Sequence, residues 1–275
     1  MTPDYAHIEL SYVVACYFDC PGGPEALLAL LRRYAAYAPD ILDRLQFVIV
    51  DDASPVPIAI PGDIDLNLLL LRINENIPWN QPGARNLGAV YARSDKLVMT
   101  DLDHALPEPT LATMLRRRNP GRTIYKVRRQ TPNGDILRPH PNTFFLSRGR
   151  FLRLYGYDED FCGHYGHDDP MFWRWQRQNG TRFLYLPQHC HALYLGTKDT
   201  PHDHSLERNL AHNAKLAATK KTAWRQFGPA RGHSRRFLGF TWQTVLDRPR
   251  STPTPPAKPN RTWLHTWWWR WLLPT

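Results

Sequence analysis

Two carboxylates that follow an apolar run are the residues most suggestive of chemistry. Leu97, Val98 and Met99 predict a buried strand, and Asp101 and Asp103 come directly after it. Open α/β sheets bind ligands in the crevice outside the carboxyl ends of their strands. Because side chains alternate along an extended backbone, both carboxylates point to one side. They could hold one divalent cation together, or one could bind the metal and the other a sugar hydroxyl.

An isolated Asp-x-Asp is usually a polar turn after a strand, but the surroundings of this one favour a site. A second apolar run, residues 47–50, also ends in paired acids, Asp51 and Asp52. A predicted helix at residues 25–38 separates this run from an earlier strand, and the β-α-β order indicates a parallel sheet. We therefore expect the two acid pairs to converge at one edge of that sheet.

Residues 156–174 contain a dense cluster of glycines, histidines, acids and aromatic side chains. Glycine lets the backbone approach a ligand closely, and aromatic rings offer flat faces to a sugar. A helix is predicted to begin near Pro170, so Asp168 and Asp169 would lie at its positive end. Either carboxylate could instead cap the helix, although capping and catalysis are compatible. The density of the cluster favours a site.

Histidines accumulate in the last third of the chain. His202 and His204 lie one residue apart, so both rings could turn to one side, and imidazole is a good ligand for manganese-like metals. A single histidine is more often solvated or hydrogen-bonded. The pair therefore predicts a contribution to a metal site.

The elements that must position these groups alternate between strands and helices. We predict strands at residues 8–18, 47–50, 66–73, 97–99, 123–129, 142–146 and 182–186, and helices at 25–38, 84–92, 107–118, from about 170, and 206–218. This order predicts an α/β fold with a mostly parallel central sheet flanked by helices.

Composition limits the classes of protein and of partner. The chain has 275 residues, enough for a large core, and its net charge of +10 favours an anionic partner such as a nucleotide phosphate, a nucleic acid or a membrane surface. Its 4 cysteines contain no CxxC pair, which suits a reducing compartment. No signal peptide or long apolar span is visible, so we expect a cytoplasmic location.

The carboxyl-terminal part differs in composition from the rest. We predict a folded domain at residues 1–247, a Pro-rich linker at 248–262 and a Trp-rich amphipathic tail at 263–275. Tryptophan prefers the membrane–water interface and nearby arginines favour anionic lipid, so we expect the tail to make the protein peripheral on the inner face of the cell membrane. Docking on a partner or on the protein's own surface is the alternative.

Taken in order, these motifs resemble the GT-A superfamily of nucleotide-sugar glycosyltransferases, especially its family 2 enzymes and the galactosyltransferase-type carboxyl-terminal motif. The resemblance runs over residues 8–213 and implies the GT-A (Rossmann-like) fold for the domain. The family's second strand ends in an acid that contacts the nucleobase, which implies this role for Asp52, with Asp51 as its rival. Its Arg-Asn helix start beside the nucleotide matches Arg85 and Asn86.

The resemblance also implies a metal site. Asp101 and Asp103 match the family's Asp-x-Asp motif, in which Asp103 would coordinate the ion that bridges the donor diphosphate. His202 and His204 resemble the His-x-His metal element of some galactosyltransferase-type relatives, with His191 as a possible substitute. The implied cofactor is Mn²⁺ or Mg²⁺.

The last motif concerns the sugar. Residues 165–172 are similar to the family's Trp-Gly-x-Glu-Asp-x-x-Phe signature, with Tyr165 and Gly166 at its start and tyrosine in place of tryptophan. Aligned in this way, Asp169 corresponds to the catalytic base, and Asp168 to the acid that contacts the acceptor or donor sugar. Asp168 replaces a glutamate of the family pattern.

The resemblance implies a metal-dependent inverting glycosyltransferase that moves a sugar from a nucleotide-sugar, with UDP as the carrier, to a glycan or lipid-linked saccharide. A nucleotidyltransferase acting on sugar phosphates is one alternative, but residues 20–24 lack the lysine or arginine that would hold a triphosphate. A basic nucleic-acid-binding module is another, but the arginines are scattered and no binding motif is present. We therefore expect no nucleic-acid partner.

Overall fold

The computed structural model describes residues 5–196 and 205–251 and has a mixed α/β architecture. A sheet of eight strands in the order β10-β6-β9-β4-β1-β2-β3-β12 forms the centre of the molecule, and a sheet of four strands in the order β5-β11-β7-β8 adjoins it. The eight strands of the large sheet are β1 (Leu10–Cys16), β2 (Leu45–Asp51), β3 (Asn67–Ile73), β4 (Lys96–Thr100), β6 (Thr123–Lys126), β9 (Phe144–Ser147), β10 (Arg182–Tyr185) and β12 (Trp242–Arg248). The small sheet contains β5 (His104–Ala105), β7 (Arg128–Gln130), β8 (Ile136–Leu137) and β11 (His191–Tyr194).

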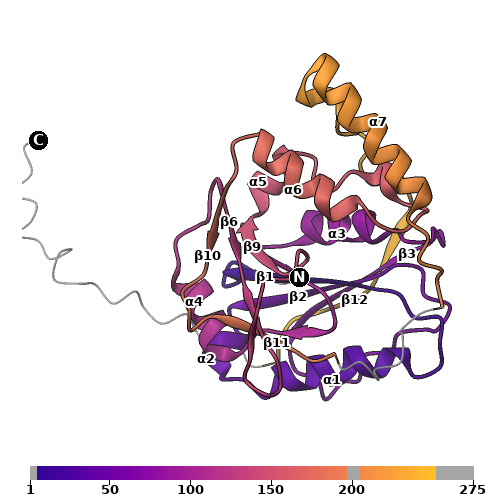
Figure 1. The fold of residues 1–275 in the computed structure, drawn as a ribbon. Helices are drawn as coiled ribbons and strands as arrows, with labels where there is room; N and C mark the ends of the chain where they lie inside the picture. The colour runs from indigo at the N-terminus through magenta and orange to yellow at the C-terminus, as the bar shows by residue number, and fades with distance from the viewer. Residues whose placement is uncertain (1–4, 197–204, 252–275) are drawn as a thin grey trace, which may run out of the picture.

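Helices cover both faces of the large sheet. They are α1 (Gly23–Ala35), α2 (Pro39–Leu42), α3 (Gln81–Tyr91), α4 (Glu108–Arg116), α5 (Arg148–Arg153), α6 (Asp168–Gln178) and α7 (Ala211–Phe227), with short 3₁₀ turns η1 (Glu159–Phe161) and η2 (Pro229–Arg231). Figure 1 shows α1 on one side of the sheet and α3, α5 and α6 on the other. Each side has its own apolar core because the buried strands direct alternate side chains to opposite faces.

The central strands set the position of the acid pairs. β1 pairs in parallel with both β2 and β4, and β2 pairs in parallel with β3, as the β-α-β order of the sequence predicts. Strand β9 is antiparallel to β4 and β6, and β12 is antiparallel to β3. The carboxyl ends of β1, β2 and β4 therefore meet at one edge of the sheet.

Some boundaries differ from those expected. The expected strand at residues 123–129 is two strands, β6 and β7, which belong to different sheets. Helix α3 begins at Gln81 rather than Ala84, because Pro82 fits the first turn of a helix. Helix α7 begins at Ala211 and continues to Phe227, where the expected helix covered 206–218.

Strand β12 was not expected. It forms the edge of the large sheet and pairs with β3 through Trp242–Arg248, so its last residue is the first residue of the expected linker. Several of its side chains are exposed, which weakens the periodic apolar pattern by which strands are recognised. Residues 252–275, which include the rest of the linker and the Trp-rich tail, lie outside the described residues.

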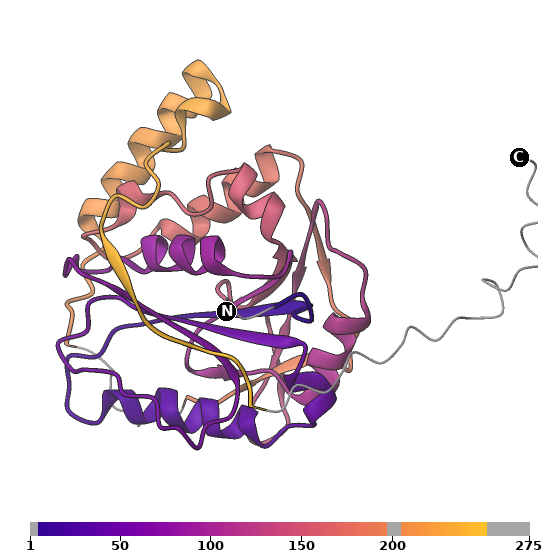
Figure 2. The same cartoon turned by 180° about the vertical axis from the view of Figure 1, so that it is seen from behind.

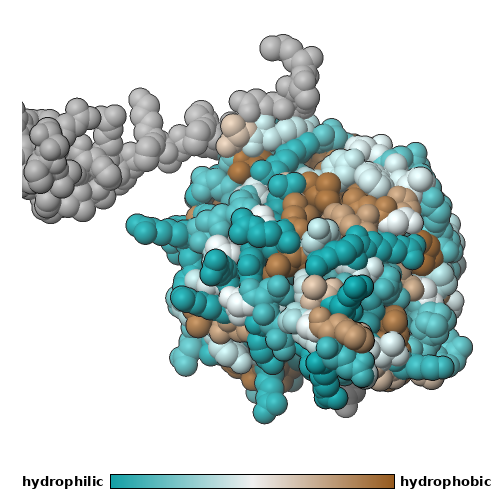
Figure 3. Space-filling view, turned by 90° about the horizontal axis from the view of Figure 1, so that it is seen from above, coloured by the Kyte–Doolittle hydropathy of each residue, from teal (hydrophilic) through white to brown (hydrophobic). Residues whose placement is uncertain are grey.

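Helix α7 extends away from the body of the molecule, as the opposite view in Figure 2 also shows. Seen from above, the surface is mostly hydrophilic, with hydrophobic side chains in patches between the polar ones (Figure 3). Among the described residues, we find no helix with the length and apolar character needed to cross a membrane.

Candidate functional site

A cleft of about 800 Å³ opens at the carboxyl ends of β1, β2 and β4. It collects carboxylates from three separate segments of the chain: Asp52 after β2, Asp101 and Asp103 after β4, and Asp168 and Asp169 at the start of α6. Each acid pair singled out in the sequence therefore contributes at least one carboxylate to the same cleft. Polar and aromatic side chains complete its lining: Tyr17, Trp79, Gln81, His140, Asn142, His164, Tyr165, His167, Tyr194 and Arg208.

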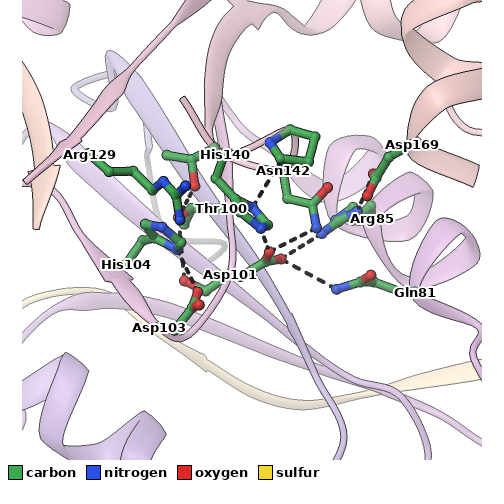
Figure 4. Close-up of polar contacts among 12 residues, drawn as sticks. Gln81, Arg85, Thr100, Asp101, Asp103, His104, Arg129, His140, Asn142 and Asp169 are labelled. Carbon is green, nitrogen blue, oxygen red and sulfur yellow. Dashed lines mark hydrogen bonds and ion pairs between the residues drawn. The ribbon is translucent and has the colours of Figure 1, made fainter. Parts of the chain in front are cut away.

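Asp101 is held by other side chains of the protein. Its Oδ1 lies 2.5 Å from Nη2 of Arg85 and accepts a 3.3 Å hydrogen bond from Gln81, while Oδ2 accepts one of 2.8 Å from Asn142. Figure 4 shows these groups converging on the carboxylate. Burial alone would raise the pKa of Asp101, but Arg85, His140 and Asn142 outweigh it and hold that pKa below its ordinary value. Asp101 is thus an anion engaged on both oxygens.

Asp103 has different surroundings. Its side chain is 42% exposed, and its Oδ1 lies 2.5 Å from Nδ1 of His104, which is fully buried. Both carboxylates of the Asp-x-Asp segment line the cleft, but β4 ends at Thr100, so the turn that follows the strand places them there rather than the expected alternation along it. Their partners also differ. Of the two, Asp103 is the one available to a ligand.

The start of α6 directs two carboxylates into the cleft. Gly166 and His167 have φ angles of 85° and 67°, and this left-handed turn leads directly into the helix at Asp168. His167 occupies the N-cap position, so Asp168 and Asp169 are the first residues of the helix and not its caps. Their carboxylates lie near the positive end of the helix.

Asp169 combines burial with a nearby like charge. Burial, followed by the negative charge of Asp168, raises the pKa of Asp169 to about 7, and the positive charge of Arg85 opposes this rise. The Oδ1 atom of Asp169 lies 3.3 Å from Nη1 of Arg85. A carboxylate that titrates near neutrality can accept a proton from a hydroxyl group, which suits a general base.

Arg85 connects the Asp-x-Asp segment after β4 to the start of α6. It projects from α3, its side chain is 1% exposed, and it contacts Asp101 and Asp169 through different nitrogens. Its guanidinium also lies over the ring of Tyr157, 5.2 Å from the centroid. Despite burial, the nearby tyrosine and carboxyl groups raise the pKa of Arg85, so it remains a cation.

The two acids at the carboxyl end of β2 have different surroundings. Asp51 accepts a hydrogen bond from the backbone N–H of Ser54 and forms an ion pair with Arg72, and it does not line the cleft. Asp52 lines the cleft and accepts a 2.8 Å hydrogen bond from Asn80. Burial raises the pKa of Asp52 to about 7, with a smaller contribution from Asp51. Only Asp52 is therefore placed to contact a ligand.

Tyr165 and Gly166 both line the cleft, but Asn86 does not. The side chain of Asn86 is fully buried and bonds to the loop before η1 and to the first residue of η1: it donates to the carbonyl of Tyr157 and to the side chain of Glu159, and accepts from the N–H of Tyr157. These contacts connect α3 to that loop. Asn86 therefore supports the backbone beside the site and does not line the cleft itself.

The residues present fit a divalent cation only if a ligand shares it. In residues 5–196 and 205–251, no group of three or more His, Cys, Asp or Glu side chains could hold a metal ion. His202 and His204 lie outside the described residues, and His191, in β11, does not line the cleft. Magnesium-type sites often use one or two carboxylates together with substrate phosphates. Asp103 suits such an ion when a diphosphate supplies further oxygens.

Sequence reasoning missed several side chains of the cleft. Gln81 and Asn142 hold Asp101, His140 lies 3.4 Å from it, and Trp79 packs against Tyr165. Gln81 lies just before the predicted helix at residues 84–92. Had that helix been predicted to start one turn earlier, Gln81 would have been placed beside Arg85. His140 and Asn142 stand between short strands, and nothing in their local sequence indicates that they reach the Asp-x-Asp segment.

No protein-family model and no curated protein sequence matches the chain. Among solved structures, S. aureus TarS 1–349 in complex with UDP-GlcNAc superimposes with a TM-score of 0.57 at 14% identity, over 79% of this chain and 67% of that one. A second structure of TarS 1–349 gives 0.54 at 16% identity, over 79% and 66%. The catalytic domain of Drosophila β1,4-galactosyltransferase 7 with xylobiose gives 0.49 at 13% identity, over 75% and 78%.

The chain spans about two thirds of the TarS 1–349 structures that it matches. At these sequence identities the likeness concerns the fold. The large central sheet flanked by helices, with its acid-lined edge, is therefore the GT-A fold that the sequence motifs predicted.

Proposed function

We propose that the protein is a glycosyltransferase that moves a sugar from a nucleotide-sugar donor, with UDP as the carrier, to a hydroxyl group of a saccharide acceptor. The observation that carries this proposal is that Asp103 and Asp169, 66 residues apart in the numbering, line one cleft at the carboxyl edge of the sheet. The fold supports it, because a structure with the same fold holds UDP-GlcNAc.

The charge of the cleft supports a metal-assisted donor site. Five carboxylates line it, and Arg208 is the one arginine or lysine among the lining residues that the structure describes. A diphosphate entering such a site needs positive charge to offset repulsion. A divalent ion on Asp103, Mn²⁺ or Mg²⁺, would supply that charge where negative charge develops on the leaving nucleoside diphosphate.

The chain's own residues account for the other parts of the reaction. Asp52 lies at the β2 end of the cleft, where it can accept a hydrogen bond from a nucleobase. The acceptor hydroxyl loses its proton to Asp169 as its oxygen bonds to the anomeric carbon, and the bond from that carbon to the diphosphate oxygen breaks. Attack from the side opposite the leaving group inverts the anomeric centre. Arg85 keeps Asp169 close to the Asp-x-Asp segment.

The experiment that tests the proposal is a panel of UDP-, GDP-, dTDP- and CMP-sugars, each with and without Mn²⁺, measured by thermal unfolding and by donor hydrolysis. A ligand present at a hundredfold excess over its Kd stabilises the folded state by about 2.7 kcal/mol. We expect a metal-dependent rise in melting temperature with a UDP-sugar. If no donor stabilises the protein under either condition, the proposed function is wrong.

Asp103→Ala tests the metal site. We expect this variant to lose most of the Mn²⁺-dependent part of the donor stabilisation, because Asp103 is the exposed carboxylate of the Asp-x-Asp segment, while Asp101 is held by Arg85 and Asn142. Asp63→Ala is the matched control, since Asp63 is exposed and outside the cleft. Unchanged metal dependence in Asp103→Ala would remove Asp103 from the ligand set.

The proposal includes a cellular location and an acceptor. We place the enzyme in the cytoplasm, peripheral on the inner face of the cell membrane through its Trp-rich segment at residues 263–275, with a glycan or lipid-linked saccharide as acceptor. The support is the composition of that segment together with the net charge of +10, because both favour an anionic surface.

A further inference from the structure

A second hollow adjoins the cleft at the amino-terminal end of α7. Its volume is about 440 Å³, and it is lined by residues from three segments: Pro78 and Trp79, 163–165, and residues between 206 and 212. Trp79, His164, Tyr165 and Leu206 line both this hollow and the main cleft. The cleft and the hollow therefore lie side by side, with these residues between them.

The shared wall is held in place by specific contacts. The rings of Trp79 and Tyr165 pack with centroids 4.6 Å apart, and the indole N–H of Trp79 donates a 3.0 Å hydrogen bond to the carbonyl of Glu207. The backbone N–H of Gly163 bonds to the carbonyl of Pro78 at 2.8 Å. The wall is therefore a defined surface between the two spaces.

Asn213 fixes the same loop from the other side. This residue of α7 is fully buried, and its side-chain nitrogen lies 3.0, 2.7 and 2.9 Å from the carbonyl oxygens of Phe161, His164 and Gly166, which share its two N–H groups. One amide thus ties the loop that carries Tyr165 to the helix that borders the hollow. Such support keeps a binding surface in one conformation before a ligand arrives.

The lining matches the chemistry of a sugar. Trp79 and Tyr165 offer aromatic faces to the C–H face of a pyranose ring. The imidazoles of His164 and His212 are stacked with centroids 3.6 Å apart, and Glu207 is exposed at the rim. These groups can donate to and accept from hydroxyls. Pockets for small ligands typically measure about 300–1,000 Å³, so the hollow is large enough for a sugar unit.

We propose that this hollow is a second acceptor subsite, which binds the sugar next to the one that receives the transferred residue. The acceptor is then a chain of at least two sugars. The inference rests on the proposed function, because Asp169 sets the order of the two subsites. Asp169 and Tyr165 both line the main cleft, and Tyr165 also lines the hollow, so a saccharide whose terminal hydroxyl lies at Asp169 extends along Tyr165 towards the hollow.

The test compares matched mono- and disaccharides by saturation-transfer NMR in the presence of UDP and Mn²⁺. The pairs are N-acetylglucosamine with chitobiose, xylose with xylobiose, and glucose with cellobiose. We expect at least one disaccharide to bind about tenfold more tightly than its own monosaccharide. If no disaccharide in the panel has that advantage, the second subsite is wrong.

Variants locate the effect. Ala211→Trp places a large ring in the hollow, and we expect the ratio of disaccharide to monosaccharide affinity to fall towards one. Ala218→Trp is the matched control, because Ala218 is exposed on the same helix and lines neither space. The ratio is insensitive to partial loss of folded protein. An unchanged ratio in Ala211→Trp, or an equal fall in Ala218→Trp, would overturn the proposal.

The two proposals fail in different ways. Donor stabilisation by a UDP-sugar is measured without any acceptor and tests the transferase function alone. If the donor binds and the disaccharide has no advantage, only the second subsite is wrong. If no nucleotide-sugar binds but the disaccharide ratio depends on Ala211, the hollow binds saccharide and the transferase function is wrong.

Discussion

Arg85 shows how one buried cation organises the candidate site. It lies between Asp101, which follows β4, and Asp169, which begins α6, and it contacts both. A buried guanidinium is stable only when its charge is paired, so these contacts hold the two carboxylates at a fixed separation. Both carboxylate oxygens of Asp101 are occupied, one by Arg85 and the other by Asn142. Asp103 and Asp169 are therefore the carboxylates that can contact ligands.

Asp169→Asn keeps the size of the side chain but removes its ability to take a proton. General base catalysis typically contributes about 10²–10⁴-fold, so we expect kcat to fall by that factor while donor binding persists. Steady-state transfer assays and donor melting shifts measure the two quantities. Asp63→Asn, at an exposed position outside the cleft, is the control and should retain full activity. Wild-type turnover in Asp169→Asn would assign the base to another residue.

The pKa of Asp169 makes a separate prediction about pH. Burial and then the charge of Asp168 raise this pKa to about 7. A base works only when it is ionised, so kcat/KM should be low in acid, rise with a midpoint near pH 7 and level off above it. Asp168→Asn removes the like charge and should move the midpoint to lower pH. A wild-type midpoint below pH 5 would mean that another group is titrating.

At the scale of elements, α3 is the helix that places Arg85 between Asp101 and Asp169, and a glycine allows this helix to approach the sheet closely. A Cβ atom at Gly88 would lie 2.3 Å from Cγ1 of Val13, a buried residue of β1, and 3.3 Å from Cγ2 of Val50 in β2. Valine has few rotamers, so it cannot easily move away. The depth at which α3 packs therefore depends on this position.

Gly88→Ala tests that packing. Overpacking a core costs about 1–3 kcal/mol, which exceeds the gain of about 0.5–1 kcal/mol from replacing glycine by alanine within a helix. We expect a net decrease in the free energy of unfolding, measured by urea denaturation. Gly62→Ala is the control, since nothing lies within 4 Å of a Cβ built there. Equal stability of the two variants would show that α3 tolerates a shift.

For the whole molecule, the net charge of +10 favours an anionic binding surface. We predict that deleting residues 263–275 releases the protein from vesicles that contain phosphatidylserine. Binding of the full chain should weaken as salt is raised, because screening acts on exposed charges. Sedimentation with vesicles measures this, with neutral phosphatidylcholine vesicles as the control. Equal binding with and without residues 263–275 would contradict a membrane role for the tail.

The sequence alone determined the alternation of strands and helices and the segments that carry the acids. Both depend on local patterns: apolar runs for strands such as β2 and β4, and polar residues at their carboxyl ends. Because parallel strands end at a common edge, the convergence of Asp52 and Asp103 on one cleft was predictable from the order of elements, whereas the place of Asp169 in that cleft was implied by the resemblance. The same order predicted an α/β fold with a mostly parallel sheet, and the resemblance of the motifs implied that this is the GT-A fold.

Only the tertiary structure decided which acid of each pair is available to a ligand. Asp51 pairs with Arg72 from the neighbouring strand β3, and Asp101 with Arg85 and Asn142, and no local pattern specifies these partners. The same is true of β12, which pairs with β3 across more than 160 residues. Contacts between distant segments, which exist only once the chain has folded, set the burial, the pairing and hence the pKa of each carboxylate.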